Sequence, residues 1–187
     1  MAHRRSFTLV RGRRTVLPLS SSLDAKTLRQ AFGHFTTGVA VISCAEPDTT
    51  DRLPLGMTVN SLTSVSLDPP LILFCSKAGR TLEQILQTQS FAINYLSTEQ
   101  LELARHYAGQ KTELTETSWS NSPQLQCPWF DGCLAWLECK LHQVVESGDH
   151  RILIGQVVSL KIENQPQPPL AFYRGQWGQF TPTSTPA

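Results

Sequence analysis

The sequence predicts a mainly β protein with a few helices, folded as an antiparallel barrel whose ends the helices cover. Two observations favour this class: strand-like segments of moderate length are joined by hairpin turns, and helical segments are few and short. A third is that strands do not alternate with long helices, which disfavours the parallel sheet of dinucleotide-binding domains. The motifs GxGxxG and GxxxxGK(S/T) are also absent, so any nucleotide must be held in another way.

The first expected elements are a helix and a hairpin. Ser21 and Asp24 can cap a helix whose apolar side chains recur with helical spacing and form one stripe. These side chains are Leu28, Ala31, Phe32 and Phe35. Residues 38–44 (GVAVISC) are β-branched and apolar, which predicts a strand, and a second strand is expected from about Leu55. The two strands should pair as a hairpin across the polar loop between them.

Residues 68–109 predict two further strands and two helices. Residues 68–70 (DPP) break the chain, because a proline cannot donate to a sheet and restricts the residue before it. The elements expected next are a strand at 71–76, a turn at 77–80, a helix at 81–89 with Leu82, Ile85 and Leu86 inward, and a strand at 91–96. Ser97 and Gln100 then predict a capping box for a helix that ends at Gly109.

The last third of the chain predicts a loop and a long hairpin. Residues 110–132 are polar and irregular, and we expect a long surface loop there. Residues 134–147 and 151–163 predict the two strands of a β-hairpin that turns at GDH. In its first strand Ala135, Leu137, Cys139 and Leu141 alternate onto one face, and Glu138, Lys140 and His142 onto the other. Residues 170–180 are expected to form a closing strand or an extended tail.

Composition limits the classes of partner. The chain has 187 residues, 40% of them hydrophobic and 17% charged, which suits one globular domain at 23–180. A formal net charge of +1 provides no overall field to attract nucleic acid, so no nucleic-acid partner is expected. The apolar runs fall well short of the ~20 residues that a membrane span requires, so we expect no membrane partner.

The five cysteines point to a reducing compartment. They are odd in number and show neither a CxxC pair nor a Cys/His cluster with metal-binding spacing. We therefore expect reduced, mostly buried thiols in a cytoplasmic protein, and no metal site.

Both chain ends differ from the rest. Residues 1–22 hold five arginines and no acid, which resembles a transit peptide, but they lack a proper apolar region and cleavage site. We expect a disordered basic extension there and a flexible tail at 181–187.

An uncharged polar stretch at residues 58–66 is the first candidate binding surface. Six of its nine side chains are hydroxyls or an amide, and apolar residues flank it on both sides. Because buried polar groups need hydrogen-bond partners, the stretch predicts a polar ligand against this wall. Lys77 and Arg80 flank a turn just after a strand, where either could neutralise a phosphate or simply be solvated; Arg80 is favoured for its two-pronged guanidinium.

Six segments carry a resemblance to a known family. They are AFGHFTTGVAVIS (31–43), GMTVNSLTSVSLDPPLILFC (56–75), SFAINYLS (90–97), DGCLAWLEC (131–139), GDHRILIGQV (148–157) and YRGQWG (173–178). With these segments in this order, the chain resembles the flavin-reductase-like family, whose members have the FMN-binding split-barrel fold. Each segment is weak by itself, and their collinearity over roughly residues 28–178 makes the resemblance specific.

The resemblance implies a homodimer of split barrels that binds FMN, or FAD, near the subunit interface and reduces it with NADH or NADPH. The expected activity is that of an NAD(P)H:flavin oxidoreductase that supplies reduced flavin to a separate monooxygenase. The alternative is an FMN-binding electron carrier or sensor without efficient nicotinamide oxidation. Because hydride passes directly from nicotinamide to flavin, the protein mainly positions the two rings, and no acid or base residue is expected.

The resemblance also implies site residues. Thr58, Val59 and Asn60 would lie along the flavin ring and ribityl chain, with Ser64 and Val65 nearer the phosphate. The full set of expected cofactor-binding residues is Thr37, Gly38, Val39, Thr58, Val59, Asn60, Ser61, Ser64, Val65, Lys77, Arg80, Ser90, Phe91, His150, Tyr173 and Arg174. His150, in the GDH turn, would lie near the nicotinamide; from the residues alone, a solvated turn histidine is the alternative.

Overall fold

The computed structural model describes residues 24–46, 53–112, 114, 117–164, 167–181 and 183. The expected disordered extension at 1–22, the capping role of Ser21 and most of the expected tail at 181–187 lie outside the described residues.

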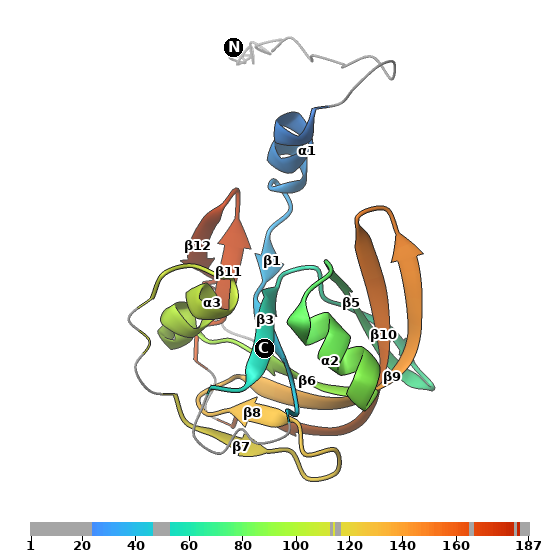
Figure 1. Cartoon of the computed structure of the whole chain (residues 1–187). Helices are drawn as coiled ribbons and strands as arrows, with labels where there is room; N and C mark the ends of the chain where they lie inside the picture. The colour runs from blue at the N-terminus through green and yellow to red at the C-terminus, as the bar shows by residue number, and fades with distance from the viewer. Residues whose placement is uncertain are drawn as a thin grey trace, which may run out of the picture.

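Seven strands form one antiparallel sheet that curls into an open barrel (Figure 1). In chain order they are β2 (Ala40–Cys44), β3 (Leu55–Val59), β4 (Thr63–Leu67), β5 (Pro70–Ser76), β6 (Ser90–Tyr95), β9 (Ala135–Ser147) and β10 (His150–Ile162). Their order across the sheet is β3-β2-β6-β9-β10-β5-β4. The prediction of a mainly β, antiparallel barrel is confirmed, as are the hairpins of β2 with β3 and of β9 with β10.

Two smaller sheets flank the barrel. One consists of β1 (Thr37–Gly38), β11 (Leu170–Tyr173) and β12 (Gln176–Gln179), and the other of β7 (Trp119–Asn121) and β8 (Pro128–Phe130). The C-terminal segment is therefore a hairpin that pairs back onto β1. Its turn has φ of 49° at Arg174 and 77° at Gly175, which is the left-handed backbone that two-residue hairpin turns require.

The barrel stays open between β3 and the second half of β5. Strand β4 pairs with β5 only as far as Leu73, so residues 74–76 have no described ladder partner on that side. Ser61 bridges the gap, because its hydroxyl accepts a hydrogen bond from the Cys75 amide at 3.0 Å and donates to the Cys75 carbonyl at 3.3 Å. We call this opening the seam. The described contacts across it involve side chains rather than a ladder of backbone hydrogen bonds.

Apolar side chains of the strands and of α2 (Arg80–Thr88) fill the barrel. They include Ile42, Ile72, Phe74, Leu82, Ile85, Phe91, Ile93 and Leu153. The inward positions of Leu82 and Ile85 confirm the predicted helix face. Packing is tight where β10 crosses the Phe91 ring, since a Cβ at Gly155 would overlap Phe91 Cζ. Glycine is the residue that allows this crossing.

The outer face of β2 is buried too. Val39 and Val41 pack in a second cluster with α3 (Leu101–Tyr107) and β8. Burial on both faces explains why this strand is apolar at every position but Ser43. Before α3 comes the single turn η1 (Thr98–Gln100), where the Gln100 side chain accepts a hydrogen bond from the Ser97 amide at 3.1 Å, as the capping-box prediction required.

Helix α1 (Ala25–Phe32) stands away from the barrel, at the top of Figure 1. Asp24 caps it by accepting hydrogen bonds from two backbone amides. Its apolar stripe meets no core among the described residues: no residue of the helix is buried, and Phe32 and Phe35 are 72% and 79% exposed. Because a helix this short depends on tertiary contacts for stability, its apolar face needs a surface that the described part of the chain does not supply.

The prediction of a long surface loop at 110–132 is wrong for its second half. The β7–β8 hairpin lies there, and Phe130 is fully buried. Asn94 of β6, also buried, holds the hairpin: it accepts a hydrogen bond from the Phe130 amide at 2.9 Å and donates one to Ser43 Oγ at 2.9 Å. One asparagine in an apolar strand does not reveal its remote partner, so the sequence could not place this hairpin.

Glu138 lies on the same face of β9 as Lys140, as predicted, but it is fully buried. Its carboxylate accepts hydrogen bonds from the Ser122 hydroxyl and from the amides of Gln124 and Leu125. The loop between β7 and β8 therefore folds over this part of the sheet and is tied to it by one carboxylate.

Candidate functional site

The seam opens onto a cavity of about 420 Å³, which we call the seam cavity. It is lined by residues 57–61 at the end of β3, residues 75–82 from β5 into α2, and His150 at the start of β10. Strand β3 is an edge strand, so alternate backbone N–H and C=O groups face away from β2. The cavity thus combines backbone groups of a sheet edge with side chains from two strand ends and a helix N-terminus.

The hydroxyls of the polar stretch are used mainly within the protein. Thr58 Oγ1 donates to the Ala104 carbonyl of α3 at 2.7 Å, and Ser61 Oγ bonds the Cys75 backbone across the seam. Asn60 is exposed, and its amide has no partner among the described residues. The hydroxyls that were expected to bind a ligand therefore hold the seam together instead. The exposed Asn60 amide remains as the neutral polar group.

Two cations line the seam cavity, and each is paired with a carboxylate. Lys77 Nζ lies 3.4 Å from Asp149 Oδ2, and Asp149 Oδ1 lies 2.7 Å from His150 Nδ1. The hydrogen bond and charge of His150, followed by those of Lys77, lower the pKa of Asp149. The GDH turn therefore meets the start of α2 at the cavity mouth.

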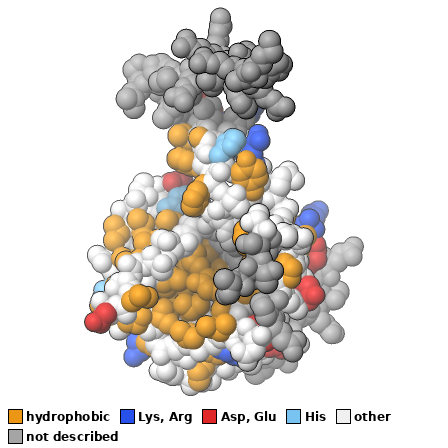
Figure 2. All heavy atoms as spheres, turned by 180° about the vertical axis from the view of Figure 1, so that it is seen from behind, with side chains coloured by type: hydrophobic (Ala, Val, Ile, Leu, Met, Phe, Trp, Pro, Cys, Tyr) orange, Lys and Arg blue, Asp and Glu red, His pale blue; other side chains and the backbone are white. Residues whose placement is uncertain are grey.

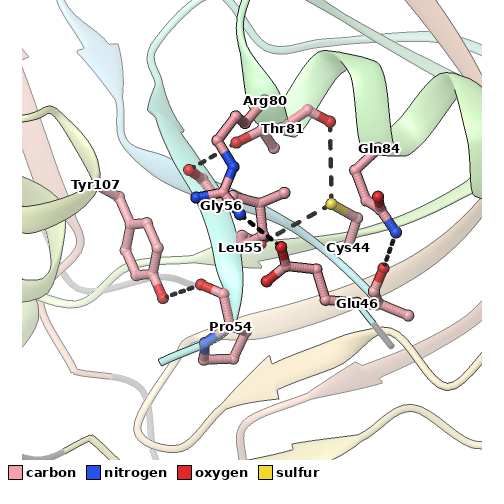
Figure 3. A network of polar contacts seen from close by, with 10 residues as sticks. Cys44, Glu46, Pro54, Leu55, Gly56, Arg80, Thr81, Gln84 and Tyr107 are labelled. Atoms are coloured by element: carbon pink, nitrogen blue, oxygen red, sulfur yellow. Dashed lines mark hydrogen bonds and ion pairs between the residues drawn. The ribbon is translucent and has the colours of Figure 1, made fainter. Parts of the chain in front are cut away.

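Arg80 is paired on the other side of the same turn (Figure 3). Its guanidinium donates to Glu46 Oε1 at 2.9 Å. The next residue, Thr81, donates to the Gly56 carbonyl at 2.9 Å, which fixes the first turn of α2 against β3. The N-cap of α2 is Gly79, with no side-chain cap, and residues 79–81 line the cavity, so no capping side chain competes there for the first amides of the helix.

Two further cavities adjoin the seam cavity. The Tyr95 cavity, of about 430 Å³, is lined by Gly38, Val39, Asn60, Leu62, Thr63, Ser64, Tyr95, Leu96 and Leu170, among others. The aromatic cavity, of about 230 Å³, includes Val39, Val59, Asn60, Phe172, Gly175 and Trp177. Asn60 lines all three cavities and so stands where they meet.

The structure brings most, but not all, of the expected site residues together. Thr58, Val59, Asn60, Ser61, Lys77, Arg80 and His150 line the seam cavity, and Gly38, Val39 and Ser64 line the Tyr95 cavity. Ser64 is therefore in a different cavity from the two cations, and Val65, on the exposed edge strand β4, lines none of these cavities. Thr37 belongs to β1, and its buried hydroxyl has no partner among the described residues.

Four more of the expected residues lie apart from both the seam cavity and the Tyr95 cavity. Ser90 and Phe91 are buried in β6, and the Phe91 ring packs edge-on against Phe74 in the core. Tyr173 lies edge-on to His34, and Arg174 lines a separate hollow with Lys26 and Arg29 of α1.

Sequence reasoning missed Glu46, which holds Arg80. It follows β2 in a polar loop, where it looks like any surface acid, and only the fold brings it to α2. In the part of the chain that the structure describes, no group of three metal-binding side chains lies together. None of the described helices has the length and apolar composition to cross a membrane.

Comparison with known proteins identifies the family. The model of the flavin reductase like domain matches residues 32–181. The chain belongs to the flavin reductase-like family. This confirms the resemblance found in the six sequence segments.

Curated relatives are 32% to 40% identical to this chain over the aligned residues. The reductase subunit of stachydrine N-demethylase from Rhizobium meliloti (strain 1021) is 40% identical over 140 residues, which cover 74% of this chain and 59% of that protein. A flavin reductase of Pseudomonas putida is 34% identical over 161 residues, covering 86% and 92%. The chain spans about half to three fifths of the length of the first curated relatives that it matches.

Solved structures of flavin reductases have the same fold. The NADH:FAD oxidoreductase of Streptomyces globisporus C-1027 superposes with a TM-score of 0.77 at 32% identity, covering 90% of this chain and 100% of that one. Component B of nitrilotriacetate monooxygenase from Mycobacterium thermoresistibile gives a TM-score of 0.77 at 32% identity, covering 87% and 90%. The split-barrel prediction is confirmed by these likenesses.

Proposed function

We propose that this protein is an NAD(P)H:flavin oxidoreductase that binds FMN, or FAD, in the seam cavity. The observation that carries the proposal is the convergence, in one cavity of about 420 Å³, of a sheet edge, the Asn60 amide, two cations and a histidine. Family relatives described as a flavin reductase and as an NADH-dependent FAD reductase support it.

The residues of the seam cavity fit a flavin phosphate. Lys77, Arg80 and the N-terminal amides of α2 would hold the phosphate, since charge-assisted bonds and helix N-termini both favour anions. Asn60 and the free edge of β3 would meet the carbonyls and nitrogens of the ring with neutral groups. When bound, the flavin supplies the centre that accepts hydride from the nicotinamide.

The protein's own part in the reaction is then positioning. His150 sits at the mouth of the cavity, where it can orient the nicotinamide, and Asp149 fixes the ring of His150 through the 2.7 Å contact. Gly38 and Val39 line the adjoining Tyr95 cavity and would present backbone to the ring. Thr58 and Ser61 would act by holding the seam in shape.

The product and the assembly are part of the proposal. Relatives are named as reductase components of monooxygenases, including one for trigonelline, so we infer that the reduced flavin passes to a partner monooxygenase. We also infer a homodimer, supported by the apolar face of α1, which the described residues leave exposed. Figure 2 shows apolar side chains gathered around a hollow on one face of the molecule.

The localisation is also part of the proposal. The five cysteines are free thiols, which fits a cytoplasmic protein.

A turnover assay tests the proposed function. A small amount of purified protein is mixed with excess FMN or FAD and with NADH or NADPH, and nicotinamide oxidation is followed by absorbance. We expect turnovers far in excess of the protein with at least one pair. Oxidation that stops at one equivalent would favour an electron carrier or sensor and overturn the proposal.

A further inference from the structure

Both cations of the seam cavity are already engaged before any ligand enters. Lys77 lies 3.4 Å from Asp149, and Arg80 lies 2.9 Å from Glu46. The pairs lie on either side of the turn that leads into α2, one at each end of the segment 77–80. The two carboxylates therefore offset the two positive charges at the place where a phosphate would bind.

The Arg80 pair joins an exposed cation to a more enclosed acid. The Arg80 side chain is 79% exposed, whereas the Glu46 side chain is 22% exposed (Figure 3). The guanidinium can thus turn away from Glu46 toward the cavity, while the carboxylate stays behind. A phosphate at Arg80 would then lie close to a second negative charge.

The Lys77 pair on the other side of the turn differs, because its acid is exposed as well. Both side chains are largely exposed, at 67% for Lys77 and 79% for Asp149. The hydrogen bond to His150 is the largest cause of the lowered pKa of Asp149, and Lys77 is a smaller one. This carboxylate is therefore ionised at neutral pH. It therefore carries its full charge under working conditions.

We propose that Glu46 and Asp149 compete with the flavin phosphate for Arg80 and Lys77, and so keep the flavin exchangeable. A phosphate that enters must share or displace each carboxylate, and the like charges that remain nearby repel it. The binding site thus contains two carboxylates that compete with the phosphate, which suits a reductase that releases reduced flavin. This inference rests on the proposed function, because it assumes a phosphate-bearing flavin in the seam cavity.

The test compares FMN with riboflavin, which has the same ring but no phosphate. Dissociation constants are measured by flavin fluorescence for the wild type, Glu46→Gln and Asp149→Asn. We expect each variant to bind FMN roughly two- to fivefold more tightly, as the removal of an exposed ionic interaction allows. Riboflavin affinity should stay unchanged, and the dissociation of FMN should slow in parallel.

Glu102→Gln is the matched control, because it removes a carboxylate paired with Arg105 at 2.6 Å on α3, outside the residues that line the seam cavity. It should leave both affinities unchanged. Weaker FMN binding by Glu46→Gln would mean that Glu46 orients Arg80 for the phosphate, and it would overturn the inference. An equal change for FMN and riboflavin would overturn it as well. Failure of the wild type to bind any flavin would instead overturn the proposed function.

Discussion

At the scale of residues, Asn60 lies where the three cavities of the candidate site meet. It follows β3 directly, and its side chain lines the seam, Tyr95 and aromatic cavities. An amide can donate and accept at once, so it suits a ring that presents both kinds of group. The hydroxyls around it serve the protein instead, with Thr58 tied to α3 and Ser61 tied to β5.

His150 should affect the nicotinamide more than the flavin. It lines the mouth of the seam cavity at the tip of the β9–β10 hairpin, beyond the two cations. We expect His150→Ala to raise the KM for NADH or NADPH severalfold while changing the KM for flavin little. Steady-state kinetics with each substrate varied in turn measure this. Unchanged KM values for both substrates would remove His150 from the site.

Gly155 should be the glycine of the barrel least tolerant of a side chain. The added methyl of Gly155→Ala would meet the Phe91 ring, which is itself fixed in the core against Phe74. We expect a loss of about 1 to 3 kcal/mol in the free energy of unfolding, as for other overpacked cores. Gly178→Ala is the matched control, since nothing lies within 4 Å of its added methyl. Denaturant unfolding that gives equal stability for the two variants would contradict this packing.

At the scale of elements, Glu138 should decide whether the β7–β8 hairpin stays on the sheet. Removing its carboxylate with Glu138→Ala leaves the Ser122 hydroxyl and the amides of Gln124 and Leu125 without their acceptor. We expect a loss of about 3 kcal/mol of stability, since buried donors left unpaired are costly. Glu138→Gln retains one oxygen acceptor and should lose less. Chemical denaturation of both variants measures the difference, and equal losses would show that the acceptor does not matter.

Local pattern predicted most of the elements. The apolar run of β2, the inward Leu82 and Ile85 of α2 and the long β9–β10 hairpin follow from periodicity and turn residues. The β7–β8 hairpin does not, because its position depends on Asn94 and Glu138, whose partners are remote in the sequence. The seam was predicted only in part: its polarity is visible at residues 58–66, but the direction of each hydroxyl is a tertiary property.

The candidate site, too, was predicted only in part from the sequence. From the sequence, Lys77 and Arg80 were expected at the flavin phosphate through their turn, and His150 near the nicotinamide through the resemblance; the structure brings all three to one cavity. The sequence could not show that each cation already has a carboxylate partner. Glu46 reaches Arg80 across 34 residues of chain, and no spacing rule connects them.

At the scale of the whole molecule, α1 should join two copies of the chain. Phe32, at the end of this helix, and Phe35, just after it, are exposed, and no residue of the helix is buried. We expect the wild type to be a dimer and the double variant Phe32→Ser, Phe35→Ser to be a monomer, as measured by size-exclusion chromatography with light scattering. Phe180→Ser is the control, because it removes a phenylalanine that is 60% exposed outside α1. A monomeric wild type would contradict this role of α1.

We propose that the barrel, its open seam and the helix that begins beside it together form the flavin site. A crystal structure of the protein grown with FMN shows whether they do. We expect the flavin ring and ribityl chain in the seam cavity next to Asn60, with the phosphate between Lys77 and Arg80 at the start of α2. A flavin that occupied only the Tyr95 cavity, or that was absent at saturating FMN, would contradict this arrangement.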